Sequence, residues 1–343
     1  MRGVIIHAPK DLRVEEVEVP PLGARDVRVR IEAGGICGSD LHYYHHGGFG
    51  TVRLRQPMAL GHEIAGTIDE VGSEVSRVHP GIRVAVNPSQ PCDACRYCRA
   101  EQRNHCLDMR FMGSAMRLPH VQGGFRQSIT IDERQAVPIT ATMTMAEAAM
   151  AEPLAVCLHA ARLAGPLADA KVLVTGCGPI GTLAIVAARH GGAAEIVATD
   201  VSSYPLTLAQ RVGASRTINV ADAPDALTAY TPEKGNFDVL FEASGNEAAL
   251  RGALDAVRPG GIVVQLGLGG EMKLPINVIV TKELQLRGTF RFDEEFRLAV
   301  ELMGGSAIDV KPLLTDTLPF ERASEAFELA SDRSRAMKVQ LAF

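Results

Sequence analysis

The chain has 343 residues, of which 46% are hydrophobic, and a formal net charge of -5 at pH 7. This length predicts two domains, and the absence of any basic block argues against nucleic acid as a partner. No segment has the pattern of a signal peptide or a membrane span, because charged residues interrupt the most apolar region. We therefore expect a cytoplasmic protein that acts on a small molecule and makes no contact with membranes.

Residues 1–150 have the pattern of a mostly antiparallel β unit with long loops. Apolar and charged residues alternate in DVRVRIE, and glycine and proline punctuate nearly every join. Two glycine-rich segments of this unit carry potential metal ligands, Cys37 and His62. From spacing alone, a buried thiol and a core histidine would explain these two residues better than a metal site would.

Four cysteines lie close together in a turn-rich lobe at about residues 88–110. Their spacing is C-x2-C-x2-C-x7-C, which can place four thiolates at the corners of one tetrahedron. This pattern favours zinc over a disulfide pair or idle thiols. A zinc ion with four cysteine ligands has no open position, so we expect a structural site made by Cys92, Cys95, Cys98 and Cys106.

The pattern changes near Ala146, first to a helical stretch that includes Glu152 and then to alternating strands and helices over residues 151–290. Six apolar strand candidates recur at intervals of about twenty residues, which predicts an α/β fold with a Rossmann-type, doubly wound parallel sheet. The candidates are KVLVT, EIVATD, RTINV, FDVLFEAS, GIVVQLG and ELQLRGTF. The last segment, 291–343, is too short for a domain, and we expect it to pack back on the β unit.

A glycine-rich turn follows the first of these strands and opens a helix. In this context the three glycines permit a tight turn, approach of a pyrophosphate and close packing of helix on strand. Asp200 ends the next strand, where a carboxylate binds the adenosine ribose of NAD and repels the 2′-phosphate of NADP; the alternative is a simple turn residue. The predicted cofactor-binding residues are Gly176, Gly178, Pro179, Ile180, Gly181 and Asp200.

Together, the segments Cys37-Gly-Ser39-Asp40-Leu-His42 and Gly61-His62-Glu63, the cysteine lobe and the GxGPxG turn resemble the zinc-dependent medium-chain alcohol and polyol dehydrogenases. The resemblance covers essentially the full length. It implies a GroES-like β domain and a Rossmann domain, an active site in a cleft, NAD as cofactor, two zinc ions per chain and a homotetramer.

The same resemblance implies a catalytic zinc held by Cys37, His62 and Glu152, with Glu63 as a competing ligand. Glu152 stands where the alcohol dehydrogenases have a second cysteine, which is the pattern of the sorbitol-like branch. The resemblance also assigns Ser39 to contact with the substrate hydroxyl and His42 to a proton relay. The alternative is that Ser39 caps a helix and His42 lies on its surface.

For the substrate, the resemblance favours a secondary alcohol of a six-carbon sugar acid, with a neutral polyol as the alternative. A sugar acid needs hydroxyl-binding groups and a cation for its carboxylate. The candidates are Tyr43, Arg110, His120 and Arg291, although Arg110 could equally be a surface charge. Phe292 stands where the sorbitol branch has a tyrosine. A metal-free nucleotide-binding sensor is the remote alternative.

Overall fold

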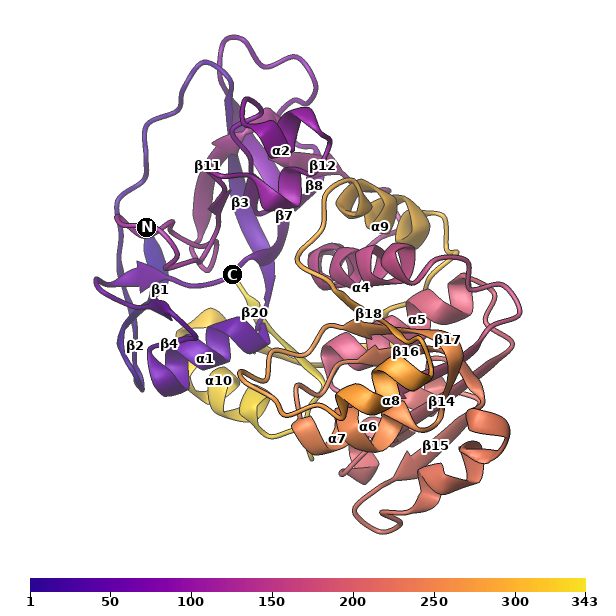
Figure 1. Cartoon of the computed structure of the whole chain (residues 1–343). Helices are drawn as coiled ribbons and strands as arrows, with labels where there is room; N and C mark the ends of the chain where they lie inside the picture. Colours follow the sequence, from indigo (N-terminus) through magenta and orange to yellow (C-terminus); the bar gives the residue numbers. More distant parts are fainter. The chain divides into compact units, whose positions relative to one another are not determined.

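The computed structural model describes residues 1–343, which form two compact units (Figure 1). Unit 1 comprises Met1–Glu152, Phe296–Asp332 and Lys338–Phe343. Unit 2 comprises Pro153–Glu295 and Arg333–Met337. None of the helices combines the length and the apolar character that a bilayer crossing requires.

Unit 1 is built on a seven-stranded, mostly antiparallel sheet, as the sequence predicts. The path is β12-β8-β7-β3-β20-β19, and β11 pairs with β3. Alternate residues of β3 (Val27, Val29 and Ile31) are buried, so this strand forms the centre of the core. The strands are β3 (Asp26–Gly35), β7 (Glu63–Val71), β8 (Arg83–Val86), β11 (Ser128–Asp132), β12 (Ala136–Pro138), β19 (Leu314–Pro319) and β20 (Lys338–Ala342).

Smaller elements surround this sheet. The other strands are β1 (Arg2–Ala8), β2 (Asp11–Glu16), β4 (Gly48–Phe49), β5 (Val52–Arg53), β6 (Met58–Ala59), β9 (Ser89–Gln90) and β10 (Arg110–Phe111). The helices are α1 (Gly38–His46), α2 (Arg96–Arg99), α3 (Met145–Ala149), α9 (Glu295–Gly304) and α10 (Ala323–Ser331).

Unit 2 is built on a six-stranded parallel sheet with the order β15-β14-β13-β16-β17-β18. All six predicted strands are present: β13 (Lys171–Thr175), β14 (Glu195–Asp200), β15 (Arg216–Asn219), β16 (Phe237–Glu242), β17 (Val257–Gln265) and β18 (Gln285–Gly288). Its helices are α4 (Ala151–Ala164), α5 (Pro179–His190), α6 (Ser203–Arg211), α7 (Glu247–Leu254) and α8 (Ile276–Thr281). The strand order reverses between β13 and β16, which is where sheets of this type bind ligands.

Strand pairing in unit 1 brings distant segments of the chain together. Gly35 at the end of β3 pairs with Glu63 at the start of β7, so Cys37 and His62 emerge side by side. β20 pairs with the same end of β3 through Gln340 and Gly35. A Cβ atom on Gly35 would lie 2.2 Å from an Oε atom of Glu63, so only glycine leaves room for this carboxylate.

Candidate functional site

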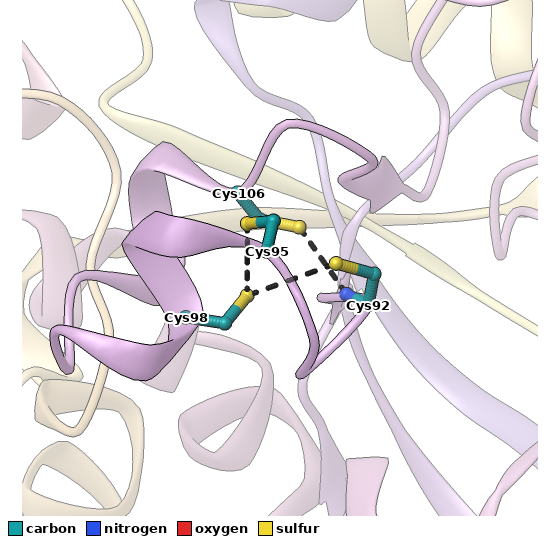
Figure 2. A group of neighbouring side chains, drawn as sticks. All are labelled: Cys92, Cys95, Cys98 and Cys106. Atoms are coloured by element: carbon teal, nitrogen blue, oxygen red, sulfur yellow. Dashed lines mark hydrogen bonds between the residues drawn. The ribbon is translucent and has the colours of Figure 1, made fainter.

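The four cysteines of the lobe converge on one point (Figure 2). Their sulfur atoms all lie within 4.8 Å of one another. The Sγ atoms of Cys95 and Cys98 are 3.5 Å apart, and those of Cys92 and Cys98 are 4.0 Å apart. With Zn–S bonds of about 2.3 Å, the edge of a tetrahedron is about 3.8 Å, so these separations suit a zinc ion.

Backbone groups already stabilise part of this sulfur quartet. The Cys92 and Asp108 amides donate to Cys106 Sγ at 3.2 and 3.3 Å. Backbone hydrogen bonds from Cys98 and Leu107 lower the pKa of Cys95 to about 6, whereas burial raises the pKa of Cys98 to about 12. The seven cysteines are all free thiols, and a divalent cation would be needed to ionise all four of the lobe.

A second group of potential ligands lies in unit 1 and consists of Cys37, His62 and Glu63. Their ligand atoms lie within 4.8 Å of one another. His62 Nδ1 is buried and has no hydrogen-bond partner, which costs free energy unless the nitrogen binds something else, such as a metal ion. The thiolate, imidazole and carboxylate set is one that zinc accepts in catalytic sites. These residues therefore fit a metal ion.

Asp40 connects the two segments that carry these ligands. Its side chain is fully buried; one oxygen accepts from the Cys37 amide at 3.0 Å and the other from the Gly61 amide at 3.3 Å. The second oxygen also lies 3.8 Å from His62 Nδ1. Asp40 thus fixes the backbone on both sides of the site, a role that its place in the CGSDLH segment did not reveal.

Glu63 is paired with a buried lysine that sequence analysis missed. Lys338 Nζ lies 2.7 Å from each carboxylate oxygen of Glu63 and also donates to the Ile36 carbonyl at 3.3 Å. Burial alone would lower the pKa of Lys338, but the charges of Glu63 and Cys37 outweigh it and raise the pKa. The signal available in the sequence was a lysine in the apolar terminal run MKVQLAF, because lysine is almost never fully buried without a partner.

The other predicted ligand, Glu152, is buried close to this group but lies outside the tightest set of ligand atoms. Burial raises the pKa of Glu152 to about 8; His62 opposes this rise, and the negative charges of Glu63 and Cys37 add to it. Burial likewise raises the pKa of Cys37 to about 11. A bound cation would favour the ionised forms of these buried acidic groups.

The two predicted proton-transfer residues lie on α1, directly after Cys37. Ser39 is in the first turn and His42 follows one turn later. Burial, with His46 and His45, lowers the pKa of His42, which favours its neutral form. The His42 ring lies 5.8 Å from the Phe49 ring, between centroids, and is half-buried.

The glycine turn of unit 2 has the geometry that the sequence predicts. Gly176 has φ of +83°, which only glycine adopts without strain, and a Cβ on Gly181 would lie 1.8 Å from the Gly176 carbonyl oxygen. Pro179 is the first residue of α5, so no amide hydrogen is missed. Asp200 accepts from the Cys177 amide at 2.7 Å, which places its carboxylate beside this turn. Ile180 lies in the same first helical turn.

Two of the predicted substrate contacts, Tyr43 and His120, form hydrogen bonds with backbone groups of unit 1. The buried Tyr43 hydroxyl accepts from the Ala115 amide at 2.9 Å. His120 accepts from the Arg55 amide at 2.9 Å and donates to the Arg117 carbonyl at 2.6 Å, so both ring nitrogens bond to backbone groups. These bonds fix the orientation of the His120 ring, and its contact with substrate stays a prediction.

The two predicted arginines lie in different units. Arg110 is exposed at the start of β10 and lines a pocket of about 310 Å³ in unit 1. Arg291 belongs to unit 2 and adopts a left-handed backbone conformation, with φ of +55°. Its guanidinium carbon lies 4.8 Å from the centre of the Phe290 ring. Phe292 is buried, so its ring serves the core.

Comparison with known families matches both units. Residues 23–141 match the alcohol dehydrogenase GroES-like domain, and residues 179–304 match the zinc-binding dehydrogenase family. The chain is 44% identical over 316 residues to L-idonate 5-dehydrogenase (NAD(P)(+)) of Escherichia coli strain K12, covering 92% of this chain and 91% of the relative. It is 34% identical over 346 residues to sorbitol dehydrogenase of Bacillus subtilis, covering 99% of this chain and 97% of that relative.

The structure of the chain is also similar to solved dehydrogenase structures. The crystal structure of L-idonate 5-dehydrogenase from Escherichia coli K-12 superimposes with a TM-score of 0.96 at 41% identity, covering 100% of this chain and 98% of that one. Galactitol-1-phosphate dehydrogenase from Escherichia coli superimposes with a TM-score of 0.90 at 29% identity, with complete coverage of both chains.

Proposed function

This chain belongs to the zinc-binding alcohol dehydrogenase family, and on that premise we propose that it oxidises L-idonate to 5-keto-D-gluconate with hydride transfer to NAD. The observation that carries the proposal is the combination of 44% identity to L-idonate 5-dehydrogenase with the convergence of Cys37, His62 and Glu63. The first identifies the substrate class, and the second supplies a site able to act on an alcohol.

The chain would bind two zinc ions, one in the lobe and one at Cys37 and His62. A zinc ion at the second site would lower the pKa of a substrate hydroxyl and so favour loss of hydride. Glu152 is our first choice as the third ligand, because the ion pair with Lys338 already occupies both oxygens of Glu63. Glu63 remains the competing choice, since its carboxylate lies nearer to the Cys37 and His62 ligand atoms.

The residues of α1 would handle the proton that leaves the substrate. Ser39 lies two residues after Cys37 and would accept the hydroxyl proton. Burial and its histidine neighbours lower the pKa of the half-buried His42, which favours the neutral form that can take the proton on toward solvent.

We expect NAD rather than NADP as the preferred cofactor. The Asp200 carboxylate is held beside the glycine turn by the Cys177 and Ser202 amides, at 2.7 and 2.9 Å. A fixed negative charge at this end of β14 binds the ribose hydroxyls and repels a 2′-phosphate.

A neutral polyol is the second candidate substrate, because sorbitol dehydrogenases cover nearly the whole chain at 34% identity. Arg291 would separate the two cases, since a sugar acid needs a cation for its carboxylate and a polyol does not. The contacts of Tyr43, Arg110 and His120 with substrate stay predictions; Arg110 and His120 line the same pocket of unit 1.

The direct test measures NADH formation with L-idonate, D-gluconate, sorbitol and xylitol. We expect L-idonate to give the highest kcat/KM. In parallel, Cys37→Ser should reduce bound zinc from two ions per chain to one and abolish turnover while NADH still binds. Cys157→Ala, at a buried thiol of α4 outside both clusters, is the matched control for zinc content and should keep both ions. Turnover by Cys37→Ser at the wild-type rate would refute the proposal.

The protein would assemble into a homo-oligomer, and we expect a tetramer. β18 is an edge strand of the unit 2 sheet, and its Leu286 is 46% exposed. Ile276 and Val280 of the neighbouring helix α8 are also exposed. An edge strand with apolar surroundings is a template for pairing, and a second copy of the same strand is the simplest occupant.

The cytoplasmic location expected from the sequence stays a prediction.

A further inference from the structure

A buried carboxylate outside both ligand clusters, Glu242, lies at the carboxyl end of β16. Its side chain is fully inaccessible to solvent. β16 neighbours β13 at the point where the strand order of the sheet reverses. Dinucleotides bind outside the carboxyl ends of the strands at such a point. The cofactor-binding residues predicted from the sequence do not include Glu242.

The Glu242 carboxylate accepts hydrogen bonds from several neighbouring groups. The Ser244 amide donates at 2.9 Å, and the Gly245 amide lies 3.2 and 3.1 Å from the two oxygens. The Ser244 hydroxyl and the Gln265 side-chain amide also donate to it, and the Thr175 hydroxyl lies 3.4 Å away. A glutamine would turn its own NH2 group toward one of these donors. A carboxylate, whose two oxygens both accept, therefore suits this position better than an amide does.

These contacts join the ends of three neighbouring strands. Thr175 is the last residue of β13 and precedes the glycine turn, Gln265 is the last residue of β17, and Ser244 and Gly245 form the turn after β16. In addition, the Glu242 carbonyl accepts from the amides of Leu266 and Gly267 at 2.8 and 2.9 Å. Glu242 is thus the common partner of the turns that border the predicted cofactor site.

The backbones of these turns pack directly against one another. A Cβ on Gly176 would lie 2.7 Å from the Ser244 Cα, and a Cβ on Gly267 would lie 2.1 Å from the Gly245 amide nitrogen. No side chain separates them, so hydrogen bonds to Glu242 hold the spacing that side-chain packing would otherwise set.

We propose that Glu242 is a positioning residue for the nicotinamide half of the bound dinucleotide. The predicted adenosine contact, Asp200, lies at the end of β14, on one side of β13. A dinucleotide that spans the switch point must extend its other half over β16 and β17, where Glu242 fixes both turns. The inference rests on the proposed function, because it takes NAD as the cofactor.

The test compares two ligands that share the adenosine half. Dissociation constants for NADH and for AMP are measured by calorimetry on the zinc-loaded wild type, on Glu242→Gln and on Glu233→Gln, an exposed glutamate of the same unit. Glu242→Gln should weaken NADH binding by about tenfold or more and change AMP binding by less than about twofold. Glu233→Gln should bind both ligands as the wild type does.

A second variant keeps the test decisive if Glu242→Gln does not fold. Gln265→Met removes one donor to the carboxylate at similar volume and should weaken NADH binding selectively, by about threefold. Unchanged NADH binding, or equal losses for NADH and AMP, would overturn the inference while leaving the proposed function intact. Failure of the wild type to bind NADH would instead refute the cofactor assignment.

Discussion

Lys338 and Glu63 form a buried ion pair although 275 positions separate them in the chain, and each Nζ to Oε distance is 2.7 Å. The side chains are 2% and 1% exposed. Since the pair adjoins Cys37 and His62, the C-terminal strand β20 contributes directly to the charge balance of the predicted zinc site. Removing one partner would leave an uncompensated buried charge, whereas removing both would not.

Lys338→Met should therefore lower the free energy of unfolding by about 3–5 kcal/mol. The double variant Lys338→Met/Glu63→Gln should recover much of this loss, because no unpaired charge remains. Chemical unfolding of the wild type, both single variants and the double variant gives the coupling energy between the two residues. Additive losses would show that the pair does not act as a unit.

Removal of the lobe metal is the second prediction. Cys95→Ser should reduce bound zinc from two ions per chain to one and lower the free energy of unfolding, because the lobe has little apolar material to order it. The remaining ion should still support turnover. Metal analysis and thermal unfolding check this result, with Cys157→Ala again as the control. If Cys95→Ser retained two ions, the quartet would not be a zinc site.

Discrimination between NAD and NADP is the third prediction. Asp200→Asn removes the negative charge but keeps one oxygen for the Cys177 amide. The ratio of kcat/KM for NAD to that for NADP should fall by about tenfold or more, since the repulsion of a 2′-phosphate is lost. Asp225→Asn, at an exposed aspartate of the same unit, should leave the ratio unchanged. An unaltered ratio in Asp200→Asn would mean that Asp200 is only a turn residue.

Assembly through the β18 edge is the fourth prediction. Leu286→Lys places a charge on the exposed edge and should shift the protein to a smaller assembly in sedimentation velocity experiments. Leu298→Lys introduces the same charge at a leucine of unit 1 that is similarly exposed, at 42%, and should not change the sedimentation coefficient. Identical sedimentation of both variants and the wild type would exclude this edge as the interface.

Local patterns explain which features could be predicted from the sequence. The six strands of unit 2 are short apolar runs bounded by turn residues, and the four lobe cysteines lie near one another in the chain, so both can be recognised without tertiary information. The roles of Gly176 and Gly181 can also be recognised from the sequence, because a strand precedes this turn and a helix follows it.

Features that depend on long-range pairing could not be predicted in the same way. Lys338 looks like a solvent-facing position of a strand until β20 pairs with β3 and buries it beside Glu63. Tyr43 and His120 have side chains suited to a sugar, but the structure engages both with backbone groups. Whether Glu63 or Glu152 binds metal depends on how the folded chain places each carboxylate, which no spacing rule in the sequence encodes.

The stability of the protein at acid pH should depend on Glu295, a buried carboxylate that contacts the buried His159 and the exposed Arg162. His159 Nδ1 and Arg162 Nε lie 3.0 and 2.7 Å from the same oxygen of Glu295. Burial acts to raise the pKa of Glu295, but hydrogen bonds from His159 and the Asp293 amide outweigh it and lower the pKa to about 2, from 4.5.

Because the folded pKa is depressed, the unfolded chain binds more protons than the folded one between these values. The contribution of Glu295 is thus fully present above about pH 4.5 and is lost as the pH falls toward 2, for a total of about 3 kcal/mol. Urea unfolding at several pH values should give a wild-type curve that falls over this range, and Glu295→Gln should flatten it. The adjacent, exposed Glu294→Gln is the matched control and should retain the wild-type slope. If Glu295→Gln kept that slope as well, the acid dependence would have to arise from other carboxylates of the chain.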